Sequence, residues 1–158
     1  MDDVTANHEG AHVLGLIATT GRVPLEVRVD RPDLGIAGCC TIDLEDAELE
    51  YGHLIATLMG PLAEGEVIRW PPSKDATGDE RNAALLVEYL GLGEHEYRFA
   101  LAFADHLLTE HQTRGMHALI AHALGRVPVL NAAQLRELLA PYLEHFDIQP
   151  SPQEEGAA

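Results

Sequence analysis

The chain has 158 residues, of which 46% are hydrophobic, and carries a formal net charge of −16. This length and composition predict one globular domain with its own core, and they exclude a disordered chain. The acidic balance argues against a nucleic-acid partner, because neutralising phosphates requires clustered Arg and Lys. No apolar run is long enough to cross a bilayer, so we expect no membrane partner.

The start of the chain and its two cysteines bear on localisation. The opening Met-Asp-Asp lacks the basic residues that begin a secretory signal peptide. Cys39 and Cys40 are adjacent, and adjacent strand residues point to opposite faces, so a bond between them would be strained. We interpret both as ordinary strand residues, with metal binding as the minor alternative. We therefore expect a cytoplasmic protein.

The first third of the chain predicts a helix followed by a β-hairpin. Apolar residues recur at helical spacing over residues 3–20. Leu25, Val27 and Val29 alternate with charged residues, which is the pattern of a half-buried strand. The turn-forming stretch DRPDLG follows, and IAGCCTI then predicts the returning strand.

The rest of the chain is dominated by helical patterns. Predicted helices cover about residues 46–69, 79–90, 97–111, 113–126 and 132–146. We expect Gly52 or Gly60 to bend or interrupt the first of these, and Pro141 to kink or end the last. VPVL reads as an extended link, and residues 149–158 as a disordered tail. The predicted fold class is mainly α (α+β), with one domain over residues 1–148 that ends in a helical bundle.

The stretch TANHEGAHVLG carries the clearest chemical signal. It places His8, Glu9 and His12 in the order H-E-x-x-H. Helix residues four apart share a face, so both imidazoles can aim at one point, where zinc accepts nitrogen at about 2.0–2.1 Å. Glu9 lies beside that point and can take a proton from water on the metal, whose pKa zinc lowers to roughly 7. The alternative is a pair of solvated histidines on a helix surface.

A catalytic zinc takes three protein ligands and keeps one open position. The residues alone leave two candidates for the third ligand, Glu64 in GPLAEGE and Asp79 in TGDERNA. Asp79 stands at a loop-to-helix junction, where it could equally be an N-cap. Glu64 lies inside a predicted helix, where it either orients a histidine or is a solvated charge. The other histidines lack ligand spacing and read as surface or partly buried residues.

The order of these motifs resembles the peptidase domain of FtsH-like zinc metalloproteases over roughly residues 5–145. That family has HEAGH on a helix, a strand region, a helix with G-G-R-A-A-E, and a Thr-Gly loop leading to D-L-x-x-A before a helical bundle. The counterparts here are HEGAH, LEVRVDRPDLGIAG, GPLAEGEVI and TGDERNA. The resemblance implies that His8, His12 and Asp79 are zinc ligands and that Glu9 is the catalytic carboxylate. Glu64 then matches the glutamate of the helix packed behind the site.

The chain departs from the family at three points. HEGAH reverses the small pair of HEAGH, GPLAE lacks the family's arginine, and the segment between Thr77-Gly78 and Asp79 is shorter. The only lysine, Lys74, does not follow a glycine, so the sequence contains no P-loop. Because this motif is absent, the resemblance implies a peptidase that does not by itself use ATP.

The implied function is a zinc-dependent endopeptidase with Zn²⁺ as cofactor. Its substrates would be peptides or unfolded protein segments, held as an added strand by the hairpin between Val27 and Ile42. A homo-oligomer or a separate partner ATPase is compatible with the resemblance. Two alternatives remain open at this point. One is a catalytically inactive interaction domain with structural or no zinc, and the other is a helical binding module without metal.

Overall fold

The computed structural model describes residues 3–31, 36–42 and 48–150. These residues form six α-helices and three β-strands, so the fold class is mainly α with a small sheet, as the sequence predicted. In chain order the elements are α1 (Asp3–Thr20), β1 (Glu26–Arg31), β2 (Ile36–Thr41), α2 (Tyr51–Ala63), α3 (Gly78–Leu90), α4 (Glu94–Thr109), α5 (His111–Arg126), β3 (Val129–Asn131) and α6 (Ala132–Leu143).

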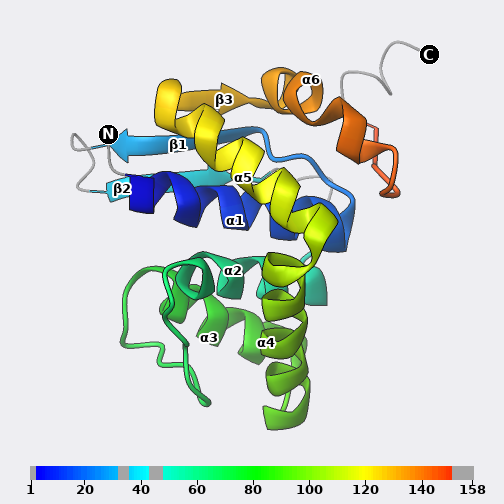
Figure 1. Cartoon of the computed structure of the whole chain (residues 1–158). Coiled ribbons are helices and arrows are strands. Elements are labelled where there is room, and N and C mark those ends of the chain that lie inside the picture. Colours follow the sequence, from blue (N-terminus) through cyan, green and yellow to red (C-terminus); the bar gives the residue numbers. More distant parts are fainter. Residues whose placement is uncertain (1–2, 32–35, 43–47, 151–158) are drawn as a thin grey trace.

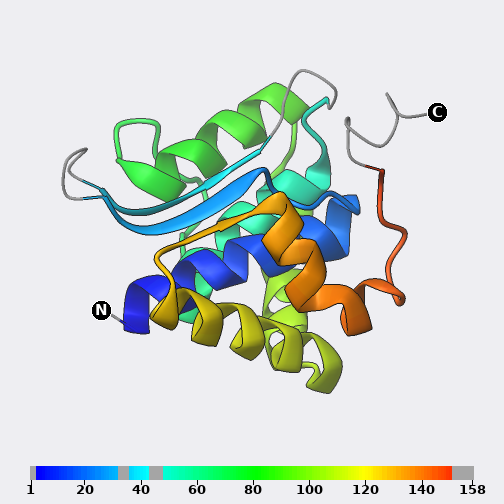
Figure 2. The same ribbon diagram turned by 90° about the horizontal axis from the view of Figure 1, so that it is seen from above.

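Helix α1 lies at the centre of the molecule. Figure 1 shows the sheet above it, α2 below it, and α3 and α4 further down. Figure 2, seen from above, shows α3 and α5 on opposite sides of α1. Because α1 is covered from several directions, its buried apolar residues are spread around the helix; they are Ala6, Ala11, Val13, Leu14, Leu16 and Ile17.

The sheet is antiparallel with the strand order β2-β1-β3. Val27 pairs with Cys40 on one side and with Leu130 on the other. Val27 and Val29 are buried against the helices, as their alternation predicted. Strand β2 is therefore an edge strand of the described sheet, and this edge faces the side on which α3 lies (Figure 2).

Several predicted boundaries are wrong. Residues 48–50 and 64–69 are not helical, so α2 is shorter than the predicted helix over residues 46–69. It ends because Gly65 adopts a φ of +80°, a left-handed conformation that suits a residue without a Cβ, and the amides of Gly65 and Glu66 bond back to the last turn. Neither Gly52 nor Gly60 interrupts α2, because packing against α1 on one face outweighs their low helix propensity.

The C-terminal third also differs in detail. The VPVL link contains β3, which the local sequence did not reveal because its partner β1 is distant in the chain. Helix α4 begins at Glu94 instead of residue 97, since Glu96 accepts a hydrogen bond from the amide of Gly93 at 3.0 Å. Asn131 caps α6, accepting from the amide of Gln134 at 2.9 Å. Pro141 lies inside α6, which ends two residues later, at Leu143.

Some predictions concern residues that the structure does not describe. These are most of the DRPDLG turn, the proposed helix start near Asp46, and residues 151–158 of the proposed tail. Gln149, also in that tail, donates from its amide to the carbonyl of Gly21 at 2.8 Å and accepts from Arg136 at 3.1 Å. Among the described helices, none combines the length and apolar character needed to cross a membrane.

Candidate metal centre

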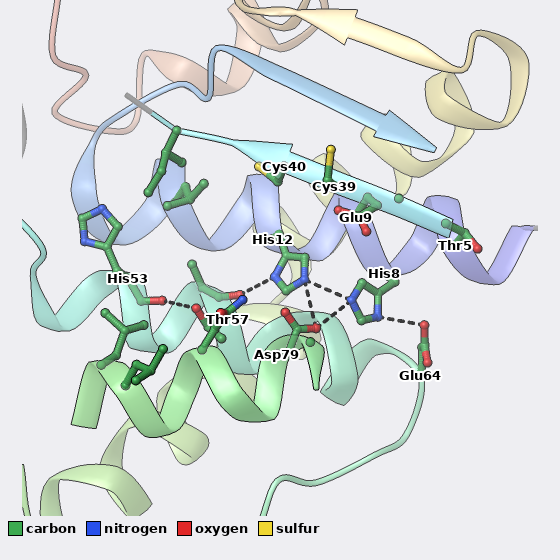
Figure 3. Close-up of a pocket in the computed structure, with 18 of the residues that line it drawn as sticks. Thr5, His8, Glu9, His12, Cys39, Cys40, His53, Thr57, Glu64 and Asp79 are labelled. Atoms are coloured by element: carbon green, nitrogen blue, oxygen red, sulfur yellow. Dashed lines mark hydrogen bonds and ion pairs between the residues drawn. The ribbon is translucent and has the colours of Figure 1, made fainter. Parts of the chain in front are cut away.

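The imidazoles of His8 and His12 converge on one point beside α1. The two residues are four apart on this helix, so their side chains share a face, and their Nε2 atoms are 3.0 Å apart. Both side chains are largely buried, at 19% and 12% exposed. Figure 3 shows the two rings side by side, with α3 below them. The interpretation as two separate solvated histidines is therefore wrong.

Asp79 reaches the same point from the start of α3. Its Oδ2 atom lies 2.9 Å from Nε2 of His8 and 3.4 Å from Nε2 of His12. Thr77 occupies the N-cap position, so the Asp79 carboxylate is not the cap of α3 and projects to the histidines (Figure 3). Burial alone would raise the pKa of Asp79, but hydrogen bonds from His12 and His8 outweigh it and hold that pKa well below its usual range.

In each ring, Nδ1 is the nitrogen that points away from the common point, and it faces an acceptor. Nδ1 of His12 donates to the backbone carbonyl of Ala56, in α2, at 2.8 Å, because a carbonyl can only accept. Nδ1 of His8 lies 2.8 Å from Oε1 of Glu64, at ion-pair distance but without the alignment of a hydrogen bond. These contacts favour protons on both Nδ1 atoms, which leaves the Nε2 lone pairs facing the common point. Glu64 thus lies behind His8 and outside the converging group.

The spacing of these atoms fits a tetrahedral ion. Ligands at roughly 2.0–2.1 Å from a tetrahedral metal lie about 3.3 Å from one another. The three separations here are 2.9, 3.0 and 3.4 Å. His8, His12 and Asp79 therefore form a group that could hold a metal ion. Two imidazoles and a carboxylate are donors that suit zinc and several other divalent transition metals.

Without an ion, the same groups share protons. Burial lowers the pKa of each histidine, but the Asp79 carboxylate outweighs burial, so the pKa of both His8 and His12 is raised. A raised pKa means that protons compete for the Nε2 lone pairs, because only the deprotonated nitrogen can bind a metal.

Gly60 provides the space beside the two nitrogens. A Cβ at this position would lie 2.4 Å from Nε2 of His12 and 2.7 Å from Nε2 of His8. Any other residue would therefore place a carbon against the atoms that converge. The glycine allows α2 to pack directly against the group and close it on one side.

Glu9 lies on α1 next to His8, and its carboxylate is turned toward β2 (Figure 3). It is only 5% exposed, and its Oε2 has no hydrogen-bond partner in the described structure. A Cβ at Gly38 of β2 would lie 2.6 Å from Oε1 of Glu9, so a glycine at this position leaves room for the carboxylate beside the strand. Burial raises the pKa of Glu9 even though the two histidines lower it, and such a shift is typical of a group that exchanges protons.

A cavity of about 740 Å³ opens on this group. Its walls come from α1, β2, α2 and α3. All five predicted site residues line it, namely His8, Glu9, His12, Glu64 and Asp79. Cys39 and Cys40 also line it as free, half-buried thiols on β2, and they take no part in the converging group. The cavity gives a ligand direct access to the three converging atoms and to Glu9.

Three contributors were missed from the sequence. The Ala56 carbonyl and Gly60 act through backbone position, which no side-chain motif reveals. His53 lies on the same face of α2, one turn before Ala56, and lines the cavity. The recurrence of positions 53, 56 and 60 at helical spacing was a signal for one shared face.

Comparison of the chain with protein-family models, with curated proteins and with solved structures finds no match.

Proposed function

We propose that the protein is a zinc-dependent endopeptidase that cleaves peptides or unfolded protein segments without ATP. The observation that carries the proposal is the buried, unpartnered Oε2 of Glu9 beside the converging group of His8, His12 and Asp79. An unpaired carboxylate oxygen in a buried position costs free energy, so its retention favours a role in chemistry over one in stability. The resemblance of the motif order to FtsH-like peptidase domains supports the same assignment.

His8, His12 and Asp79 would hold the zinc ion. Bound there, zinc supplies Lewis acidity, which acidifies a water molecule and polarises a carbonyl. Glu64 would keep the His8 ring oriented, and the carbonyl of Ala56 would do the same for His12. These contacts fix the tautomers that leave both Nε2 atoms available.

Glu9 would carry the proton transfers. Its carboxylate accepts a proton from the attacking water, whose oxygen bonds to the carbonyl carbon of the scissile peptide. Glu9 then donates that proton to the departing amide nitrogen as the C–N bond breaks. The products are a carboxylic acid, which keeps the second proton of the water, and an amine. The raised pKa of Glu9, caused chiefly by burial, brings the carboxyl closer to neutral pH, which assists both transfers.

An extended peptide fits the surroundings of the group. β2 is an edge strand of the described sheet, and its residues Gly38, Cys39 and Cys40 line the cavity. A substrate paired with this edge would pass in front of Glu9 and the converging group. Folded proteins rarely offer a free extended segment, so the substrates are expected to be peptides or unfolded chains.

The decisive test replaces one atom of Glu9. Glu9→Gln keeps the shape of the side chain but removes its ability to accept a proton, so cleavage of unfolded casein should fall at least a hundredfold. Zinc content, measured by mass spectrometry of the purified chain, should stay near one ion per chain. Glu66→Gln removes a charge from an exposed position outside the cavity and serves as the control. Undiminished cleavage by Glu9→Gln, or an absence of zinc in the wild type, would overturn the proposal.

A further inference from the structure

His53 stands at the end of the cavity remote from the metal-binding group. It lies seven residues before Gly60 on α2, with Ala56 between them on the same face. Seven residues of helix correspond to roughly 10 Å along the axis, so the backbone of His53 is about that far from Gly60, which approaches the two Nε2 atoms. Figure 3 shows the His53 ring on the opposite side of His12 from His8 and Glu64.

One nitrogen of this ring is already committed. Nδ1 of His53 accepts a hydrogen bond from the backbone amide of Glu50 at 2.9 Å, as part of the N-terminal capping of α2. Because Nδ1 is an acceptor, the proton of the neutral ring must be on Nε2. Burial lowers the pKa of His53, which keeps the ring in this neutral form.

The other nitrogen is a free donor. In the described part of the chain, Nε2 of His53 makes no hydrogen bond, and it does not belong to the polar atoms that are sealed from solvent. His53 is 5% exposed, and the residue lines the cavity. A buried ring with an unused N–H beside a cavity is a position from which a bound group can be recognised.

The cavity that His53 lines also has apolar walls. Four of its apolar lining residues come from α1, α3 and the segments that flank β2 and α2, namely Leu16, Ile42, Leu49 and Leu86. We call the space between these four residues and His53 the distal pocket. It offers apolar surface along its sides and one hydrogen-bond donor, the combination that commonly gives a binding pocket its specificity.

We infer that the distal pocket selects a tyrosine side chain next to the scissile bond of the substrate, with Nε2–H of His53 donating to the tyrosine hydroxyl. The inference rests on the proposed function for the position of the substrate. An aromatic ring can pack against apolar walls, and its hydroxyl oxygen can accept from His53. Lysine and arginine carry only donors and cannot pair with this N–H. Acidic side chains are disfavoured by the net charge of −16.

Binding of two peptide hydroxamates tests the inference without cleavage. The compounds are identical except that one carries tyrosine and the other phenylalanine, and each anchors on zinc through its hydroxamate. Calorimetry at about pH 8 with the zinc-loaded wild type should show tighter binding of the tyrosine compound, by roughly three- to tenfold, since one hydrogen bond is at stake.

Two variants separate recognition from capping. His53→Glu keeps an acceptor for the Glu50 amide at the third helical position but supplies no donor, so the preference for tyrosine should vanish. His53→Gln keeps both an acceptor and a donor, and should retain a preference of the same sign. Equal binding of both compounds by the wild type, no binding of either, or an unchanged preference in His53→Glu would overturn the inference.

Cleavage of matched tyrosine and phenylalanine peptides then separates this inference from the proposed function. A tyrosine preference in hydroxamate binding without any cleavage would refute the peptidase and leave the recognition site standing. Cleavage without a tyrosine preference in binding would refute the distal pocket alone.

Discussion

Oδ2 of Asp79 lies 2.9 Å from Nε2 of His8, although the two residues belong to different helices, α3 and α1. This contact joins the start of α3 to the middle of α1 across the cavity. It makes Asp79, and not Glu64, the carboxylate that shares the point on which both imidazoles converge. Glu64 is instead 2.8 Å from Nδ1 of the same histidine, on the far side of the ring.

The first prediction concerns these two carboxylates. Asp79→Ala removes one of three converging atoms and should lower zinc affinity by several orders of magnitude, because two ligands rarely hold zinc in a protein. Glu64→Ala removes only the partner of Nδ1 and should cost roughly 10- to 100-fold. Competition with a chromophoric chelator measures both affinities. A larger loss for Glu64→Ala would move the site toward α2.

The second prediction uses the space at Gly60. Gly60→Ala should fold, because alanine favours a helix interior by about 0.5–1 kcal/mol over glycine. Its Cβ would crowd both Nε2 atoms, so zinc affinity should fall at least tenfold. Gly115→Ala in α5 is the matched control, since its Cβ would meet only the Tyr142 side chain, at 3.2 Å or more. Thermal unfolding and zinc titration are measured together, and full zinc affinity in Gly60→Ala would contradict the geometry.

The third prediction tests the contact between β2 and Glu9. A Cβ at Gly38 would lie 2.6 Å from Oε1 of Glu9 and 2.9 Å from the carbonyl of Arg28. The strand cannot yield freely, so Gly38→Ala should displace the Glu9 carboxylate and lower kcat for peptide cleavage about tenfold or more, with zinc retained. Thr41→Ala, an exposed change on the same strand, is the control. Unchanged kcat in Gly38→Ala would show that the position of Glu9 does not depend on β2.

The fourth prediction is a pH dependence of stability. His117 is buried in α5, and its Nε2 donates to the carbonyl of Asn7 at 2.8 Å, which ties α5 to the helix that carries His8. Burial lowers the pKa of His117 below 6.5, although the bond to Asn7 raises it. The unfolded chain therefore takes up this proton at a higher pH than the folded chain. The contribution of His117 is complete above about pH 6.5 and is lost as the pH falls through that value toward the folded pKa.

His117→Gln can keep the hydrogen bond to Asn7 but does not titrate. The free energy of unfolding, from urea titrations at about pH 7.5 and about pH 5, should fall more in the wild type than in His117→Gln. All other titrating groups are common to both proteins, so the difference isolates His117. An equal or smaller loss in the wild type would mean that His117 is not held neutral by burial.

Local sequence patterns determined much of this protein. The helical spacing of His8 and His12 placed both rings on one face, and the alternation around Val27 gave a half-buried strand. The helix from Asp79 was found because apolar spacing and a loop junction coincide there. In these segments the local pattern and the tertiary environment favour the same structure, so the pattern was sufficient.

Relations between distant segments were decided only by tertiary structure. Residue spacing left Asp79 and Glu64 as alternatives, and only the resemblance of the motif order favoured Asp79, because spacing along a chain does not say which loop folds back onto which helix. Strand β3 was missed for the same reason, since its hydrogen bonds are made with β1. The packing of α2 against α1 also determines the contributions of Gly60, the Ala56 carbonyl and His53. Their roles depend on backbone proximity and burial, and these arise only when the hydrophobic faces of several helices pack together.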